Sequence, residues 1–323
     1  MLPGYHLLKD TVSDTIVYQG FHNLDVCFKT RREHFRIGKA NFNYLKQINM
    51  IETQQTISLI IGCGHLGSRV LSELESKGIQ AWATSRKQVN AELIKNPETH
   101  LLLDINNRET WKNLLPLTTA EIDVYFLLPP SQIELACLQD FVTLLGIWKI
   151  RRLVMSSSTV VYGSQSRLVD ADSEVNIDTD RAERQYSIEQ NIRSSGIELK
   201  IVRLAGLYAS DRIIGKQAIL DGQTLSGKGD SWLNLIHTTD AANLLIEVMA
   251  SETASSIEMG SDGNPVRRAN YYGDLADHYS REPPVFRNEE TERGEGRRCD
   301  NSITVERTAW RAAITDYRKG WLI

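Results

Sequence analysis

The sequence lacks the features that mark several protein classes. Its four cysteines, Cys27, Cys63, Cys137 and Cys299, lie far apart in 323 residues, without the spacing of a zinc site or a disulfide framework. No apolar run approaches the roughly 20 residues that span a bilayer, and no secretory signal pattern opens the chain. A net charge of -4 and a pI near 6.0 give no general attraction to nucleic acid or an anionic membrane. We therefore expect a cytoplasmic protein with no metal, membrane or nucleic-acid partner.

The residues that are present predict a large α/β fold. Hydrophobic residues make up 41% of the chain and charged residues 24%, which suits a sizeable core. From Thr56 onward, short apolar runs alternate with amphipathic stretches, as in the βαβ units of a doubly wound parallel sheet. The predicted strands are 57–62, 79–85, 100–104, 123–128, 151–158 and 198–206. The predicted helices are 69–78, 131–148, 181–196 and 238–250, the last capped by Thr238 or Thr239.

This pattern divides the chain into three parts. Residues 56–206 form the predicted Rossmann domain, to which 235–250 return, and 207–323 form mainly a smaller substrate lobe. Residues 1–55 precede the first convincing strand and form an extension of uncertain structure. This extension is loosely attached or comes from an upstream start codon, since Met50 lies just ahead of the first strand; the alternative is an interaction arm.

A glycine-rich loop follows the first predicted strand. Residues 62–67 read GCGHLG and fit the G-x-G-x-x-G pattern between a strand and a helix, the context that a dinucleotide site needs. Gly62 permits the tight turn, Gly64 lets the backbone approach a pyrophosphate, and Gly67 allows close helix packing. The helix N-terminus adds amides and a partial positive charge. We expect a nicotinamide cofactor here; the alternative is a glycine-rich turn without a ligand.

The end of the second predicted strand indicates which cofactor. An NAD-preferring site would offer an acidic residue about 20 residues beyond the loop. Here the strand ends in Ser85, Arg86 and Lys87, which favours NADP(H) over NAD(H) because Arg pairs well with a 2'-phosphate. The cations could instead be a solvated surface pair, and Asp104 lies either near the adenine or in a turn. The predicted cofactor-binding residues are Gly62, Gly64, His65, Leu66, Gly67, Ser85, Arg86, Asp104 and Ser156.

Residues 155–163, MSSSTVVYG, resemble the SS-x-x-VYG segment of the extended short-chain dehydrogenase/reductases, which include nucleotide-sugar epimerases and dehydratases. Further segments match in order: 203–208 (RLAGLY), 234–237 (NLIH) with Asp240, and 316–320 (DYRKG). The G-x-G-x-x-G form of the loop suggests the atypical branch of that superfamily. The resemblance covers 56–323 and implies an NAD(P)-binding Rossmann fold, a small-molecule substrate such as a nucleotide sugar, and a possible homodimer.

The resemblance also implies catalytic positions. In that superfamily a Ser or Thr, a Tyr and a Lys do the chemistry, and the Ser maps to Ser158, whose hydroxyl could bind substrate or satisfy backbone groups. The helix pattern Y-x-x-x-K-x-x-x-E maps its acid to Glu189, which places Gln185 at the Lys and Arg181 at the Tyr. Gln lacks the cation, and Arg is a poor base. Tyr186 is turned by about 140° from Arg181 around the helix and is expected to face elsewhere.

Four more residues are candidates for the site. Tyr162 and His237 could donate protons, although a buried packing role for Tyr162 and a hydrogen-bonded structural role for His237 stay open. Arg203 and Arg212 could bind a phosphate or carboxylate of the substrate, although Arg203 could equally be a paired strand residue. The function predicted from these residues is an NADP(H)-dependent oxidoreductase or epimerase-like enzyme with an altered Tyr/Lys dyad. The alternative is a protein that binds or senses NADP(H) without turnover.

Overall fold

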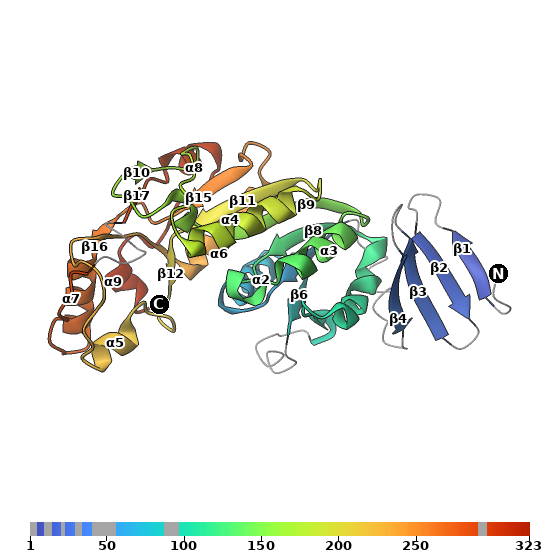
Figure 1. The fold of residues 1–323 in the computed structure, drawn as a ribbon, viewed down its shortest axis with the longest axis horizontal. Coiled ribbons are helices and arrows are strands. Elements are labelled where there is room, and N and C mark those ends of the chain that lie inside the picture. Colours follow the sequence, from blue (N-terminus) through green and yellow to red (C-terminus); the bar gives the residue numbers. More distant parts are fainter. Residues whose placement is uncertain are drawn as a thin grey trace. The chain divides into compact units, whose positions relative to one another are not determined.

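The computed structural model describes residues 5–9, 15–20, 23–29, 34–40, 56–86, 97–289 and 296–323. The chain divides into two compact units, of which the first comprises residues 1–153 and 191–198 and the second comprises 154–190 and 199–323. Figure 1 labels their elements. The domain boundaries at 55 and 206 stay a prediction.

A seven-stranded sheet is the central element, and its pairs β5–β6, β5–β8, β6–β7 and β11–β15 are parallel. In sheet order the strands are β15 (Ile257–Gly260), β11 (Leu199–Leu204), β9 (Ile150–Ser158), β8 (Glu121–Phe126), β5 (Thr56–Ile61), β6 (Ala81–Ser85) and β7 (His100–Leu102). Strand order runs outward in both directions from β5 and β8, which confirms the predicted doubly wound Rossmann architecture.

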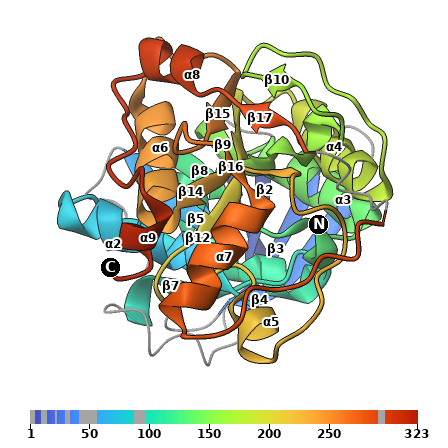
Figure 2. The same cartoon turned by 90° about the vertical axis from the view of Figure 1, so that its left-hand side faces the viewer.

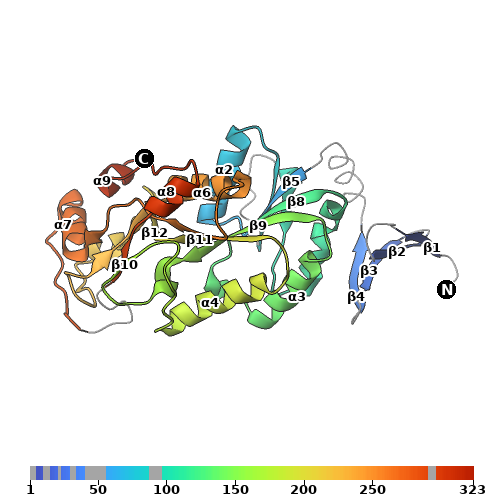
Figure 3. The ribbon, with the colours of Figure 1, turned by 90° about the horizontal axis from the view of Figure 1, so that it is seen from above.

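Unit 1 shows why the apolar runs form strands. Five of the six β5 residues and all five of β6 are buried, as expected for strands covered on both faces. Figure 3 shows α2 (His65–Ser76) and α3 (Leu135–Leu145) on opposite faces of this part of the sheet. Gly78 (φ +72°) ends α2 in a Schellman motif, in which Ile79 N donates to Leu74 O at 2.9 Å. Segments of 3-10 helix span Pro97–Thr99, Arg108–Thr119 and Pro130–Gln132.

Four strands before Thr56 form a separate antiparallel sheet that the sequence analysis did not predict. Its strands are β1 (Tyr5–Lys9), β2 (Thr15–Gly20), β3 (Asn23–Lys29) and β4 (His34–Ala40), paired in chain order. The register shifts between Val26 and Cys27.

Unit 2 holds the remaining elements. Figure 3 shows α4 (Asp180–Arg193) and α6 (Thr238–Ala250) on opposite faces of β11. Figure 2 shows α5 (Lys216–Leu220) beside α7 (Arg268–His278), and Ile219 packs with Tyr271, Tyr272 and Leu275 in one cluster. The other helices are α8 (Ser302–Arg307) and α9 (Tyr317–Gly320). The small strand pairs are β10 (Leu168–Val169) with β17 (Arg298–Cys299), β12 (Gly206–Tyr208) with β14 (Leu235–His237), and β13 (Trp232–Leu233) with β16 (Val266–Arg267).

No helix in the described part of the chain combines the length and the hydrophobicity needed to cross a bilayer. Within the same residues, no group of three or more His, Cys, Asp and Glu side chains could hold a metal ion.

Candidate functional site

The glycine loop between β5 and α2 is anchored to the neighbouring strand by Thr84. Gly62 N donates to the Thr84 hydroxyl at 3.1 Å, and Cys63 N donates to Thr84 O at 2.7 Å. Thr84 is buried at the end of β6. The sequence analysis missed this residue, although a hydroxyl at the end of the strand beside the loop is a usable signal.

The three glycines meet different surroundings. Gly62 has φ +99°, and a Cβ there would lie 2.9 Å from Leu128 Cδ2 and 3.2 Å from the Leu127 carbonyl carbon. At Gly67 a Cβ would lie 2.2 Å from Gly62 O, so helix and loop touch through backbone. A Cβ at Gly64 would meet no described atom within 4 Å. Gly62 and Gly67 are therefore required by the fold, whereas Gly64 leaves open space beside the loop.

The N-terminus of α2 is suited to an anion. Among the described side chains none caps it, and the first turn contains no acidic residue. The first amides of a helix have no acceptor within the helix, and they lie at the positive end of its dipole. Here they belong to the half-buried His65, the buried Leu66 and Gly67. This arrangement can hold the pyrophosphate of a dinucleotide.

The loop lies where the order of the strands reverses. Leu127 N, just beyond β8, donates to Ile61 O at 2.9 Å, so the ends of β5 and β8 lie side by side. In open parallel sheets ligands bind at this switch point, outside the carboxyl ends of the strands.

The residues predicted to determine the preference for NADP(H) over NAD(H) lie at the end of β6. Ser85 is buried and Arg86 is exposed, whereas Lys87 lies outside the described residues. Asp104 follows β7, and its Oδ1 accepts a hydrogen bond from Asn106 N at 3.0 Å. This contact supports the interpretation of Asp104 as a turn residue.

The second group of predicted residues belongs to unit 2 and begins at the end of β9. Ser156 is half-buried. Ser157 is buried and donates to a Glu189 carboxylate oxygen. Ser158 Oγ accepts from Val160 N at 3.2 Å and so caps the 3-10 helix Thr159–Tyr162. The backbone role weighed for Ser158 is therefore present, and a hydroxyl that accepts in this way can still donate to a substrate.

Arg203 is buried and forms an ion pair inside the protein. It is buried on β11 and forms a bidentate ion pair with the fully buried Glu189 of α4, at 2.8 Å and 3.2 Å. A buried charge needs such a partner, which excludes Arg203 as a substrate anchor in this conformation. Of the two interpretations, the paired strand residue is correct.

Helix α4 shows what occupies the mapped dyad positions. Arg181 is exposed in its first turn, and Gln185 is buried. Tyr186 packs against the cluster that contains Val161 and Met259. The tyrosine therefore has a packing role, as its helical register predicts.

Tyr162 and His237 have structural partners. The fully buried Tyr162 donates its hydroxyl to Ala171 O at 3.4 Å, and the Arg203 guanidinium lies 4.9 Å from its ring centroid. Burial raises the pKa of Tyr162, which opposes a role as proton donor near neutral pH. The buried His237 packs edge-on against Tyr208, and its Nδ1 accepts from Thr239 N at 3.3 Å. His237 is thus the cap of α6, and the predicted Thr238 or Thr239 cap was wrong.

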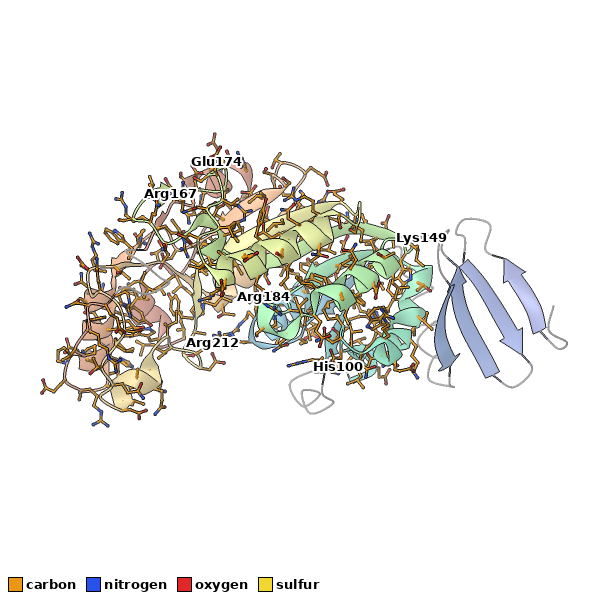
Figure 4. The ribbon with its side chains drawn as sticks, viewed as in Figure 1. His100, Lys149, Arg167, Glu174, Arg184 and Arg212 are labelled. Carbon is orange, nitrogen blue, oxygen red and sulfur yellow. The ribbon has the colours of Figure 1, made fainter. Side chains whose placement is uncertain are left out.

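Arg212 is exposed between β12 and α5 and is labelled in Figure 4 with Arg184 of α4. Its backbone pairs with Ala209, which holds the segment in a tight turn. Arg212 stays a predicted substrate residue.

Comparison with known proteins supports the fold assignment. The chain matches no family model. Protein YeeZ of Escherichia coli K12 is 24% identical over 254 residues, which cover 75% of this chain and 90% of YeeZ.

Several solved structures superpose on most of the chain. MoeE5 in complex with UDP-glucose and NAD has a TM-score of 0.68 at 18% identity and covers 82% of this chain and 96% of its own. The Thermus thermophilus UDP-glucose 4-epimerase complex with NAD has a TM-score of 0.68 at 13% identity, with the same coverage. The Thermotoga maritima UDP-glucose 4-epimerase with UDP-glucose has a TM-score of 0.66 at 15% identity. The predicted resemblance to the extended epimerase/dehydratase group is thus confirmed for the fold.

Proposed function

We propose that this protein binds NADP(H) at the loop 62–67 and is an epimerase-like or reductase-like enzyme that lacks the usual Tyr/Lys dyad. The loop geometry is the main support: amides at an uncapped helix N-terminus, open space at Gly64, and a position at the strand switch point. In addition, MoeE5 and an epimerase of the same fold were solved with NAD. The bound cofactor would supply hydride chemistry.

The preference for NADP(H) rests on the end of β6. The exposed Arg86 directly follows Ser85, the last residue of β6, and can pair with a 2'-phosphate. Neither residue is acidic, whereas an NAD-preferring site would have an acidic residue here. Thermal shifts with NADPH and NADH at matched concentrations test this preference, since a ligand at 100 times its Kd stabilises by about 2.7 kcal/mol. We expect the larger shift with NADPH and a smaller difference in Arg86→Ala. Equal or larger shifts with NADH would refute it.

Within this scheme Ser158 positions the substrate through its hydroxyl. Nucleotide sugars are the proposed substrate class because MoeE5 was also solved with UDP-glucuronic acid. The test is NADPH oxidation, or exchange of its labelled hydride, with a panel of nucleotide sugars. Ser158→Ala should lower the rate of any turnover without changing NADPH affinity.

A second candidate is an NADP(H)-binding protein without turnover. The exposed Arg181 and the buried Gln185 support it, because neither can act as the usual acid/base pair. NADPH binding without hydride exchange, persisting in the Arg181→Tyr, Gln185→Lys double variant, would favour this candidate.

The cytoplasm is the proposed location, and a homodimer is the proposed assembly. The thiols of Cys63, Cys137 and Cys299 are not in disulfides, which agrees with a reducing compartment.

A further inference from the structure

Residues 310–321, which we call the strap, run along unit 2 with little regular structure. Between the end of α8 at Arg307 and the start of α9 at Tyr317 the chain has neither helix nor strand. Alternate residues from Arg311 to Thr315 are exposed. A segment of this kind has few bonds within itself, so the side chains of neighbouring elements decide whether it stays in place.

Asp240 anchors the first half of the strap. This buried residue lies in the first turn of α6, and its Oδ1 accepts from Ala313 N at 3.0 Å and its Oδ2 from Ile314 N at 2.9 Å. Its main-chain oxygen accepts from Trp310 Nε1 at 3.0 Å. An ionised carboxylate only accepts hydrogen bonds, so it suits two backbone N–H donors. Both carboxyl oxygens of Asp240 are therefore used to hold the strap.

The second half of the strap is held by contacts at α9. The Tyr317 hydroxyl donates to Asp274 Oδ2 at 2.6 Å. The backbone of Gly320 lies against Tyr208, because a Cβ at Gly320 would be 2.7 Å from the Tyr208 hydroxyl oxygen. Trp321 is buried in the same hydrophobic cluster as Tyr208. The strap thus covers the end of β12, where Tyr208 lies.

The middle of the strap is tied to Asp262 through Asn264. Asn264 Nδ2 donates to Thr315 O at 3.1 Å and to Asp262 O at 3.3 Å, and Asn264 N donates to Asp262 Oδ1 at 2.9 Å. The Asp262 carboxyl is buried, and its Oδ2 has no hydrogen-bond partner within the described residues. The same is true of the buried hydroxyl of Tyr208. Two buried polar atoms beside the strap thus lack partners among these residues, which is uncommon in a folded protein.

The surroundings of Asp262 favour its neutral form. Burial raises the pKa of Asp262 to about 7, the Asn264 hydrogen bond opposes this rise, and the Asp240 charge adds to it. Burial also raises the pKa of Tyr208 on β12, and raises that of Cys299 on β17 to about 11, so both stay neutral near pH 7. The other titratable groups around Tyr208 are His237, which packs against its ring, and Asp316 of the strap, which is bonded to Arg318.

We propose that the strap is a pH-sensitive closure of unit 2, which stays shut while Asp262 is protonated and opens when Asp262 ionises. Under the closed strap an ionised Asp262 is a buried carboxylate whose Oδ2 has no donor among the described residues, whereas opening lets water solvate it. The strap is the part that opens because its middle has no helix or strand bonds and is joined to Asp262 through one side chain, Asn264. This inference goes beyond the proposed function and depends on neither a cofactor nor turnover.

The direction of the pH effect follows from the two states of Asp262. The closed state keeps the proton up to about pH 7, whereas a solvated carboxyl releases it near pH 3.8. Opening therefore becomes easier as the pH rises between these two values and changes little above pH 7.

Hydrogen–deuterium exchange of the full chain tests this closure. The protection factors of the Ala313 and Ile314 amides are measured from pH 4 to pH 8, because a protection factor corrects for the direct effect of pH on exchange. They should fall at least about tenfold between pH 4 and pH 7, by at most about tenfold per pH unit for one proton, and level off above pH 7. At every pH they should be lower than those of β11, since a strap that opens by itself does not need global unfolding. Protection that is constant with pH, or equal to that of β11, would overturn the proposal.

Two carboxyl variants identify the group that titrates. Asp262→Asn keeps the shape of the side chain and cannot ionise, so the protection of the strap should stay within about twofold from pH 4 to pH 8. Asp274→Asn is the matched control, because its carboxyl also bonds to the strap, at Tyr317, but its side chain is 34% exposed. It should show the pH dependence of the parent.

Either variant can contradict the proposal. If Asp262→Asn loses protection with rising pH as the parent does, or if Asp274→Asn removes the dependence, another group controls the strap and the proposal is wrong. The measurement on the parent decides the proposal even if Asp262→Asn does not fold.

Discussion

Gly64 and Gly67 belong to one loop, but an added methyl group should weaken ligand binding at Gly64 and lower the stability of the fold at Gly67. Gly64 has φ -93°, which suits any residue, and open space beside it. Gly64→Ala should therefore keep its stability within about 0.5 kcal/mol while binding NADPH at least about tenfold more weakly, because the methyl fills the ligand's space. Gly67→Ala should lose about 1–3 kcal/mol of stability through overlap with Gly62 O. Thermal melts and NADPH titrations of both variants measure these effects, and parent-like NADPH affinity in Gly64→Ala would exclude the cofactor at this loop.

Asp262 makes stability depend on pH. This carboxyl is buried, its Oδ1 accepts from Asn264 N at 2.9 Å, and its Oδ2 has no partner among the described residues. Burial raises its pKa from 3.8 to about 7, with a smaller contribution from Asp240. Between these two values the folded state keeps a proton that the unfolded state releases. The stability contributed by protonated Asp262 is thus complete below pH 4 and is lost as the pH rises toward 7.

Asp262→Asn should remove this dependence, because the amide keeps the shape and cannot ionise. We expect the free energy of unfolding of the parent to fall relative to the variant by at most about 1.4 kcal/mol per pH unit across this window. Denaturant titrations of both proteins from pH 4 to pH 8 give the difference. A difference that stays constant with pH would show that Asp262 is ionised normally in the folded state.

At single residues, the sequence predicted those roles that depend on neighbours in the chain. Gly62 and Gly67 have the predicted turn and packing roles because a strand, a loop and a helix in succession fix the local backbone. Whether Arg203 binds substrate or forms an internal ion pair depends on Glu189, which lies on another element. Sequence alone could not decide between the two interpretations, because pairing is set by how α4 packs on β11.

Among the elements, α4 provides the clearest energetic test. The Glu189–Arg203 pair joins this helix to β11 inside the protein. Glu189→Gln should destabilise the fold by about 3–5 kcal/mol, because it leaves the Arg203 charge buried without a counterion. Tyr186→Phe, on the same helix, is the control. It should change stability by no more than about 1 kcal/mol and leave NADPH binding within a few-fold of the parent. Chemical denaturation measures both.

The same helix tests the assignment of its register. A positioned general acid/base contributes about 100-fold or more to a rate. A loss of that size in Tyr186→Phe, in any turnover that is found, would contradict the register that places Arg181 at the tyrosine position. Parent-like stability of Glu189→Gln would show instead that the buried pair is not needed.

Elements were predictable where periodicity was strong. The apolar runs from Thr56 onward correspond to β5, β6, β7, β8, β9 and β11, because strands covered on both faces read as continuous apolar segments. The helix at 238–250 was predicted at its observed bounds, but its cap was not, because a histidine is not among the usual cap residues. The strands β1 to β4 were missed, since their short mixed segments resemble loops.

At the scale of the whole molecule, removing the N-terminal residues tests whether the four-stranded sheet is needed for folding of the seven-stranded sheet. The seven-stranded sheet takes all its strands from Thr56 onward, whereas β1 to β4 pair with one another and with no other strand in the described part of the chain. A chain that begins at Met50 should therefore fold cooperatively and bind NADPH like the full chain, because it keeps every strand of the Rossmann sheet. Thermal melting and NADPH titration of the two chains measure this.

A chain that begins at Cys63 is the control that shows the sensitivity of the experiment. It lacks β5, which pairs with both β6 and β8 at the centre of the sheet. Removing a central strand leaves two rows of backbone groups without partners, so this chain should not fold. If the chain from Met50 is also insoluble, or melts far below the full chain, residues 1–49 stabilise the Rossmann unit. The antiparallel sheet would then be part of the structure that the cofactor site requires.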